Sequence, residues 1–336
     1  MAPSKPETPL DVACVAIGRN EGERLRRCLN SVKDRVRSAV YVDSNSTDDS
    51  VAFAESIGVD VVQLDMSIPF TAARARNAGF ERVRAMTPDV RYVQFVDGDC
   101  EVVDGWLETA SRVLDEQSDV AIVCGRRRER HPDASIYNRL CDLEWDTPVG
   151  ETEACGGDFM IRREVMESVG GLNPELIAGE EPEFCLRVRR GGWRILRLDH
   201  EMTLHDAAMT SVKQWWKRAV RWGHACAEGA HMHGDAPEQF WVSEARRAVL
   251  WGGVVPAMAI GGVVPTFGTS LLLLGGYPLN AARTFRRSIA DGRSTSDAAL
   301  YAASCTLQKF PEFQGLVRFH VGRWAGNRSK IIEYKE

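Results

Sequence analysis

Residues 12–124 alternate short apolar, β-branched segments with amphipathic helical segments. This alternation is typical of a parallel sheet whose two faces are covered by helices. Such a sheet binds its ligands beyond the carboxyl ends of the strands, where the strand order reverses. We predict strands at residues 12–17, 39–43, 59–64, 92–97 and 120–124, and helices at 22–31, 48–57, 70–86 and 104–116.

Three acidic residues stand at the carboxyl ends of predicted strands. Asp43 ends the second strand, and the segment VDGD places Asp97 and Asp99 at the end of the fourth. Asp-Gly also forms turns, and Asp caps helices, so a purely structural role is one interpretation. The other is a divalent cation on Asp97 and Asp99 that bridges to diphosphate oxygens. A metal would replace a glycine-rich phosphate loop, because the sequence has neither GxGxxG after the first strand nor GxxxxGK[ST].

Composition narrows the class of protein. A net charge of -5 and a pI near 5.9 argue against a nucleic-acid binder. The 9 cysteines are scattered and form no CxxC pair, which argues against a zinc cluster or a disulfide framework. Free cysteines of this kind suit a protein of a reducing compartment. The N-terminal residues lack the basic start and apolar run of an export signal, so we expect the body of the protein in the cytosol.

One long segment, residues 248–282, carries no charged side chain. Pro256, Pro265 and three glycine pairs interrupt it, so we expect two short helices instead of one long one. Basic residues flank both ends, which the positive-inside rule assigns to the cytoplasmic side of a membrane, the inner membrane in a bacterium. We therefore predict a hairpin that dips into or through the membrane; the alternative is a buried hairpin of a soluble core. The flanking residues are Arg246, Arg247, Arg283, Arg286 and Arg287.

Seven elements occur in the order found in family 2 glycosyltransferases. They are RNEGERLRRCLNSV after the first strand, VDSNSTDDS, ARARNAGF, VDGD, CGGDFMIRREVMESVGG, GEEPEFCLRVRRGGWRI and LHDAAMT. The chain resembles an inverting, membrane-associated, bacterial-type member of this family. The resemblance implies an α/β GT-A fold over residues 10–235, Rossmann-like and mostly parallel, with helices on both faces of the sheet. It also leads us to expect a helical, membrane-associated region at 236–336 that contains the apolar hairpin 248–282.

The resemblance implies a donor site for a nucleotide diphosphate sugar, either a UDP- or a GDP-sugar. Asp43 would accept from the base edge, Asp97 would face the ribose or the sugar, and Asp99 would ligate Mn²⁺ or Mg²⁺. His205 would be a second metal ligand, and imidazole suits Mn²⁺ better than Mg²⁺. Glycines would let the backbone approach the sugar closely, and arginines would bind phosphate or base edges. The other implied donor-binding residues are Arg19, Glu21, Arg74, Arg76, Asn77, Gly156, Gly157 and Asp158.

Catalysis is expected from the acidic segment GEEPEF. The family pattern is Glu-Asp with the second acid as the general base, and this chain has Glu180 followed by Glu181, which is one methylene longer. Glu181 would deprotonate an acceptor hydroxyl. The alternative is an acidic helix N-terminus that interacts with the helix macrodipole.

The implied activity is metal-dependent transfer of a hexose to a hydroxyl of a glycan or a lipid-linked acceptor, as in polysaccharide or glycolipid synthesis. The segment QWWKRAVRW is similar to the QxxRW element of processive synthases, but it departs from that pattern and does not support processivity. Its tryptophans and cations suit a membrane interface. Two alternatives are transfer to a polyprenyl phosphate and a catalytically idle sugar-nucleotide binding module on a membrane scaffold.

Overall fold

The computed structural model describes residues 9–235, 237–326 and 331–332. The chain divides into two compact units. The first unit comprises Met1–His131, Glu144–Leu176 and Glu180–Ala207. The second unit comprises Pro132–Leu143, Ile177–Gly179 and Ala208–Glu336. The division at residue 235, expected from the sequence, stays a prediction.

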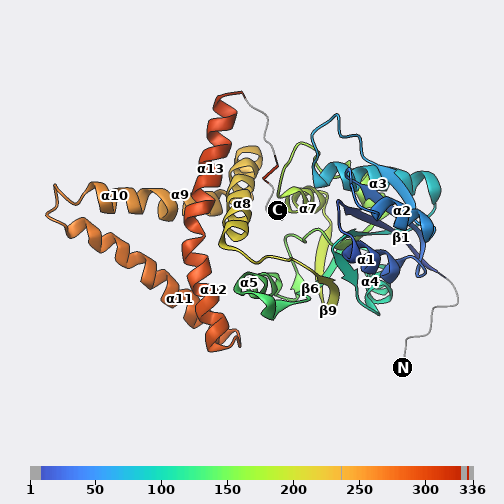
Figure 1. Cartoon of the computed structure of the whole chain (residues 1–336), viewed down its shortest axis with the longest axis horizontal. Coiled ribbons are helices and arrows are strands. Elements are labelled where there is room, and N and C mark those ends of the chain that lie inside the picture. Colours follow the sequence, from blue (N-terminus) through green and yellow to red (C-terminus); the bar gives the residue numbers. More distant parts are fainter. Residues whose placement is uncertain (1–8, 236, 327–330, 333–336) are drawn as a thin grey trace. The chain divides into compact units, whose positions relative to one another are not determined.

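A mixed sheet forms the centre of the first unit, and within the described residues it has nine strands in the order β3-β2-β1-β4-β8-β6-β9-β5, with β7 beside β9 (Figure 1). Buried apolar side chains from the sheet and its helices form one continuous core. The strands are β1 (Leu10–Gly18), β2 (Val36–Asp43), β3 (Asp60–Gln63), β4 (Tyr92–Asp97), β5 (Cys100–Val102), β6 (Val120–Glu129), β7 (Gly150–Glu151), β8 (Phe159–Arg162) and β9 (Arg194–His205).

The sheet is less parallel than the sequence suggested. Strands β3, β2, β1 and β4 are parallel, as are β6 and β9, but β8 runs antiparallel to β4 and β6, and β5 and β7 run antiparallel to β9. The prediction of a mostly parallel sheet is corrected to a mixed one. The physical reason is that antiparallel neighbours need no helical crossover, so short strands without a helix pattern can join the sheet in this way.

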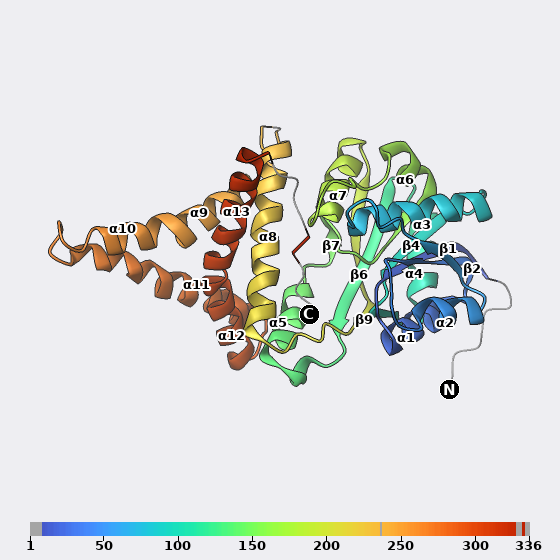
Figure 2. The ribbon, with the colours of Figure 1, turned by 45° about the horizontal axis from the view of Figure 1, so that its top comes forward.

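Helices cover both faces of the sheet (Figure 2). The crossovers through α1 and α2 step outward from β1 to β3, whereas α3 leads back past β2 and β1 to β4. Because such crossovers are right-handed, α3 lies on the face opposite α1. The helices are α1 (Glu23–Val32), α2 (Ser50–Ser56), α3 (Ala72–Met86), α4 (Trp106–Glu116), α6 (Arg163–Val169) and α7 (Glu180–Arg190), while α5 (Ile136–Trp145) has residues in both units.

This topology puts the reversal of strand order at β1. The last residues of β1 pair with both neighbours, Gly18 with Asp43 of β2 and Ile17 with Asp97 of β4. The acids at the ends of β2 and β4 therefore flank the end of β1, at the edge where ligands bind in open α/β sheets.

The second unit is helical. Its long helix α8 begins with a capping box, in which Ser211 accepts from the backbone of Gln214 and the Gln214 side chain accepts from the backbone of Ser211. Helix α8 packs very closely on α13, since a Cβ on Gly223 would lie 2.0 Å from the carbonyl oxygen of Glu312. The elements are η1 (Pro132–Ala134), α8 (Val212–His233), α9 (Val242–Val249), η2 (Leu250–Val254), α10 (Val255–Gly261), η3 (Thr269–Gly275), α11 (Gly276–Ala290), α12 (Thr295–Leu307) and α13 (Lys309–Trp324).

The uncharged segment forms two helical arms joined at residues 262–268. Gly252 and Gly253 lie inside the first arm, where they allow close contact with α13: a Cβ on Gly252 would lie 2.1 Å from the Lys309 carbonyl oxygen. Among the described residues, none of the helices combines the length and the apolar character needed to cross a membrane.

Candidate active site

Asp97 lies between two arginines at the end of β4. Its Oδ1 is 2.7 Å from Nη2 of Arg76, and its Oδ2 is 3.2 Å from Nη2 of Arg127. Its backbone nitrogen donates to Oδ1 of Asp158 at 2.9 Å. The side chain is only 26% exposed, so these contacts fix its direction. Asp97 is thus a held carboxylate and not a freely solvated turn residue.

Arg76 joins this strand end to the acidic helix α7. Its side chain is 3% exposed, and its Nη1 lies 3.3 Å from Glu180 and 3.0 Å from Glu181. Burial lowers the pKa of Arg76, but attraction to Glu181, Asp97 and Glu180 outweighs this and raises it. One buried cation therefore holds three carboxylates in a single cluster, which we call the Arg76 cluster: Arg76, Asp97, Glu180 and Glu181.

Glu181 has the electrostatic setting of a general base. Burial raises its pKa to about 7, the Glu180 carboxylate adds to the rise, and Arg76 opposes it. A carboxyl group that titrates near neutral pH can both accept and release a proton under physiological conditions. Glu180 and Glu181 occupy the first turn of α7, so the helix macrodipole also stabilises their charge.

Gly157 makes room for the Arg76 cluster. A Cβ at this position would lie 2.4 Å from Nη2 of Arg76 and 2.7 Å from Oδ2 of Asp97. Gly156, next in the chain, has no atom within 4 Å of the same hypothetical Cβ. Gly157 therefore lets the backbone pass over the ion pair, a contact inside the protein.

We expect Gly157→Ala to lower the free energy of unfolding by about 1–3 kcal/mol, because the added methyl group separates Arg76 from Asp97. The matched control is Gly156→Ala, for which a change below about 0.5 kcal/mol is expected. Urea denaturation of both variants measures the difference. Equal stabilities would show that the ion pair tolerates the methyl group.

Asp158 faces inward. It is fully buried, and besides the backbone of Asp97 it accepts from Thr203 at 2.7 Å and pairs with Arg127 at 2.8 Å.

Asp43 is 3% exposed, and its oxygens accept from Tyr41 and from the backbone of Ser46, each at 2.9 Å. Each oxygen of Asp43 keeps a second lone pair for a ligand.

The partners of the remaining expected donor residues lie outside the Arg76 cluster. Arg19 is exposed, and Glu21 pairs with Arg24 at 2.9 Å. Arg74 donates to the carbonyl oxygens of Asp65, Ile68 and Pro69, which holds that loop in place. The amide group of Asn77 bonds to the backbone of Leu172 in both directions. Their roles in donor binding stay predictions.

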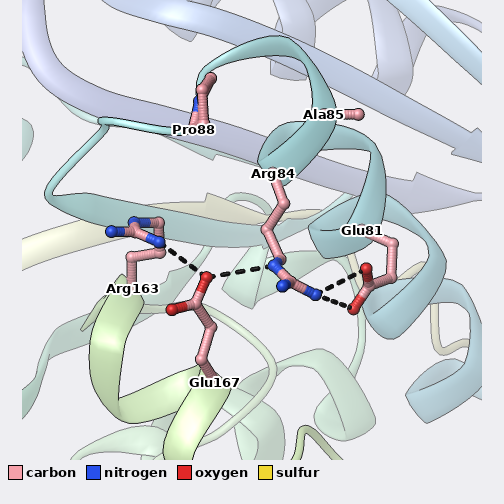
Figure 3. A pocket seen from close by; sticks show the side chains of 6 residues that line it. All are labelled: Glu81, Arg84, Ala85, Pro88, Arg163 and Glu167. Atoms are coloured by element: carbon pink, nitrogen blue, oxygen red, sulfur yellow. Dashed lines mark hydrogen bonds and ion pairs between the residues drawn. The ribbon is translucent and has the colours of Figure 1, made fainter.

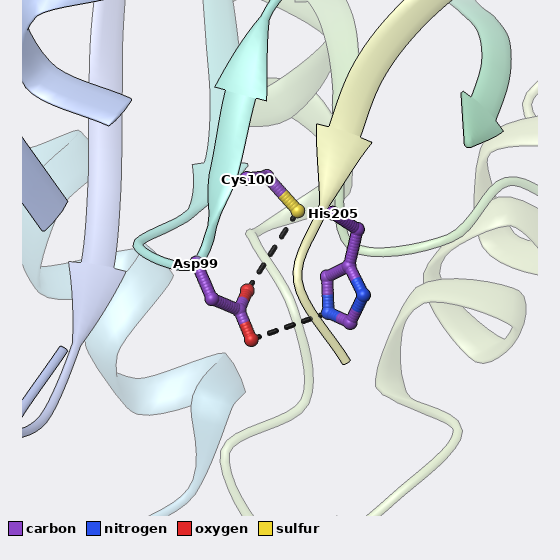
Figure 4. A group of neighbouring side chains, drawn as sticks. All are labelled: Asp99, Cys100 and His205. Carbon is purple, nitrogen blue, oxygen red and sulfur yellow. Dashed lines mark hydrogen bonds and ion pairs between the residues drawn. The ribbon is translucent and has the colours of Figure 1, made fainter. Parts of the chain in front are cut away.

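Asp99 and His205 come together across the β5/β9 pair (Figure 4). Oδ2 of Asp99 lies 3.2 Å from Nε2 of His205, and both side chains are buried. The Cys100 thiol is 3.7 Å from Oδ1 of Asp99 and completes a group of possible metal ligands. A carboxylate oxygen and an imidazole nitrogen that face each other fit a divalent cation such as Mn²⁺.

Three residues of this site were not predicted from the sequence. Arg127 and Glu129 belong to the basic run GRRRERH, which β6 carries to the site, and Trp145 ends α5. The Trp145 ring lies 4.7 Å from the His205 ring and 5.6 Å from the Arg127 guanidinium. Glu129 accepts from the backbone of His131 and Ala207 and lies 3.7 Å from Nδ1 of His205. The run GRRRERH is the sequence feature that could have pointed to Arg127 and Glu129, but the sequence does not show that β6 brings it to this site.

A hollow near the end of α3 is a different feature (Figure 3). It lies beside the start of β4, since Arg163 donates to the Val90 carbonyl oxygen, and so away from the strand-end acids. Its charges pair among themselves: Arg84 with Glu81 and Glu167, and Arg163 with Glu167. We assign it no ligand. Its lining residues are Glu81, Arg84, Ala85, Pro88, Arg163 and Glu167.

The fold defines the class: a GT-A-like α/β domain with a mixed sheet. A mannosyltransferase, PcManGT from Pyrobaculum calidifontis, solved in complex with GDP-Man and Mn²⁺, has a TM-score of 0.58 and 18% identity, covering 94% of this chain and 88% of its own. The TarS protein of S. aureus (residues 1–349) has a TM-score of 0.51 and 13% identity, covering 93% and 92%. At these identities the likeness concerns the fold alone.

Residues 15–170, slightly less than half of the chain, match the family model described as glycosyl transferase family 2. The family resemblance predicted from the sequence is thereby confirmed for these residues.

Two curated relatives extend over more of the chain. A TPR repeat-containing protein of Synechococcus elongatus is 32% identical over 245 residues, covering 63% of this chain and 57% of the relative. A pre-mycofactocin glycosyltransferase of Mycobacterium tuberculosis is 25% identical over 319 residues, covering 88% of this chain and 63% of the relative. The chain thus spans less than two thirds of the length of either relative.

Proposed function

We propose that the chain is an inverting, metal-dependent hexosyltransferase. Its donor is a UDP- or GDP-sugar, and its acceptor is a hydroxyl of a glycan or a lipid-linked molecule in cell-surface polysaccharide or glycolipid synthesis. The observation that carries the proposal is the Arg76 cluster, because it ties a strand-end carboxylate to an acid whose pKa is raised to about 7. The family match and the complex of PcManGT with GDP-Man and Mn²⁺ support the same class of donor.

Each residue has a proposed role. Glu181 takes the proton from the acceptor hydroxyl as its oxygen attacks the anomeric carbon from the face opposite the diphosphate. Asp97, held by Arg76 and Arg127, orients the donor, and Asp43 accepts from the base edge. Asp99 and His205 would hold Mn²⁺ or Mg²⁺, which when bound offsets the negative charge of the leaving diphosphate.

The experiment that tests the proposal is a panel of UDP- and GDP-sugars with and without Mn²⁺. We expect one donor to raise the melting temperature in the presence of the metal and to undergo slow hydrolysis. Stabilisation without any turnover on a range of hydroxyl acceptors would favour an idle binding module. Absence of stabilisation by every donor would refute the assignment.

We expect kcat/KM to rise as the pH rises through about 7 and to level off above it. The pKa of Glu181 is raised, so the protonated, inactive acid persists between about pH 5 and 6, where an ordinary glutamate is already ionised. A pH–rate profile measures this limb. The residual activity of Glu181→Gln is expected not to rise with pH in this range. If the rise is unchanged in this variant, another group titrates.

We also propose that the chain works at the cytoplasmic face of a membrane. The support is the charge-free segment 248–282 with basic residues on both flanks. Partition of the full-length protein between membrane and soluble fractions tests this placement.

A further inference from the structure

The turn between the two helical arms exposes large apolar side chains. Phe267 is 97% exposed, Val264 85%, Leu272 80% and Ile260 70%. Scattered single apolar residues are ordinary on protein surfaces, but a contiguous group marks a surface that binds something. These four residues belong to one segment, residues 258–272, which we call the hairpin tip (Figure 1).

The three hydroxyl groups of the hairpin tip donate to backbone carbonyl oxygens of the same segment. The hydroxyl of Thr266 donates to the Gly262 carbonyl oxygen at 2.6 Å, that of Thr269 to Thr266 at 2.9 Å, and that of Ser270 to Ala259 at 2.7 Å. In the turn itself, backbone nitrogens of residues 266, 268 and 271 donate to carbonyl oxygens of residues 262, 263 and 268. In water such internal hydrogen bonds are not required, because water itself can bond to exposed polar groups. In hydrocarbon an unpaired polar group costs several kcal/mol, so internal hydrogen bonds are needed there.

The base of the hairpin is anchored and positively charged. Trp251 of the first arm and Tyr277 of the second pack at 5.5 Å, and a Cβ on Gly253 would lie 2.6 Å from the Phe313 ring of α13. Beyond these contacts α10 extends for 7 residues, about 10 Å at 1.5 Å per residue, toward the tip (Figure 2). Exposed cations stand on both arms on the far side of this anchor: Arg246, Arg247, Arg283, Arg286 and Arg287.

We propose that the hairpin tip inserts into one leaflet of an anionic lipid bilayer, with these five arginines near the headgroups. Insertion by about 5–10 Å is the usual depth of an interfacial element and agrees with the length of α10 beyond its anchor. Basic residues next to the insertion complement anionic headgroups, whereas the same arginines on a second copy of the hairpin would repel them. This inference deepens the proposed placement at a membrane by naming the inserting residues and the lipid charge, and it does not depend on the proposed sugar transfer.

The test uses full-length protein and sedimentation with vesicles of phosphatidylcholine containing about one third phosphatidylglycerol. We expect the double variant Val264→Ser/Phe267→Ser to bind at least about 10-fold more weakly than wild type, since two apolar side chains no longer enter the lipid. Matched controls are Ile136→Ser and Val149→Ser, which remove apolar side chains that are 57% and 54% exposed elsewhere. Both controls should bind like wild type.

A second set of variants tests the headgroup contact. Arg283→Gln/Arg286→Gln/Arg287→Gln should weaken binding to the anionic vesicles by about 10²-fold and leave binding to pure phosphatidylcholine unchanged. The control is Arg112→Gln, on α4 of the first unit, whose side chain is 63% exposed.

Three results would overturn the proposal. They are a wild-type protein that does not bind the vesicles, a Val264→Ser/Phe267→Ser variant that binds as tightly as wild type, and a lipid-free dimer that this variant converts to a monomer. The last would identify the hairpin tip as an interface between copies. Nucleotide-sugar stabilisation of each variant, measured separately, keeps a failure of this proposal distinct from a failure of the proposed activity.

Discussion

Asp99→Ala is expected to abolish the Mn²⁺-dependent binding of nucleoside diphosphate while the fold stays intact. The Asp99 carboxylate faces Nε2 of His205 at 3.2 Å, and its removal leaves His205 and Cys100, neither of which supplies the oxygen ligand that a hard cation prefers. Loss of a residue that only supports a ligand costs 10- to 100-fold in metal affinity, so loss of the ligand itself should exceed about 10²-fold. The backbone bond from Asp206 to Asp99 does not involve the side chain and remains.

Titration calorimetry with UDP and GDP, with and without Mn²⁺, measures this effect. The matched control is Asp104→Ala, an acid that is 72% exposed and follows β5 in the same part of the chain. Binding of Mn²⁺ alone gives a readout independent of turnover. If metal-dependent affinity survives in Asp99→Ala, the segment VDGD is a turn and not a metal site.

Glu181→Gln should lower kcat by about 10²-fold or more if the acceptor is a hydroxyl. A hydroxyl must lose its proton to attack, and a positioned base contributes about 10²- to 10⁴-fold. The glutamine keeps an oxygen that can accept from Arg76, which lies 3.0 Å from Glu181, so the Arg76 cluster should persist and donor affinity should change little. A polyprenyl phosphate is already ionised near neutral pH, and transfer to it needs no base.

Turnover of Glu181→Gln is therefore compared on the true acceptor and on water, with donor affinity measured separately. Glu164→Gln is the matched control, because Glu164 is also an acid in the first helical turn, of α6, but is exposed. Glu180→Gln shows whether the effect belongs to one acid or to the pair. Near-normal transfer by Glu181→Gln would remove the base assignment and favour the polyprenyl phosphate acceptor.

The family and much of the first unit could be predicted from the sequence. The strands from β1 to β4 and the helices between them follow from the alternation of short apolar segments with amphipathic segments. A sheet covered by helices on both faces must bury the apolar residues of both kinds of segment. Asp43, Asp97 and Asp99 could be predicted because Asp43 and Asp97 end apolar strands and Asp99 lies two residues after Asp97. The same pattern predicts that the site lies at the carboxyl edge of the sheet, since parallel strands end at one edge.

Only the tertiary structure decided which side chains meet. Arg76 and Glu180 are 104 residues apart, and no local pattern connects them. Asp158, expected among the donor-binding residues, accepts from the backbone of Asp97 because antiparallel β8 begins beside the end of β4. Local periodicity reports which face of an element is buried. The partners of a buried charge depend on strand order and on long-range pairing. Arg127 and Glu129 therefore join the site through the pairing of β6 with β9, and Trp145 joins it through the contact of its ring with His205.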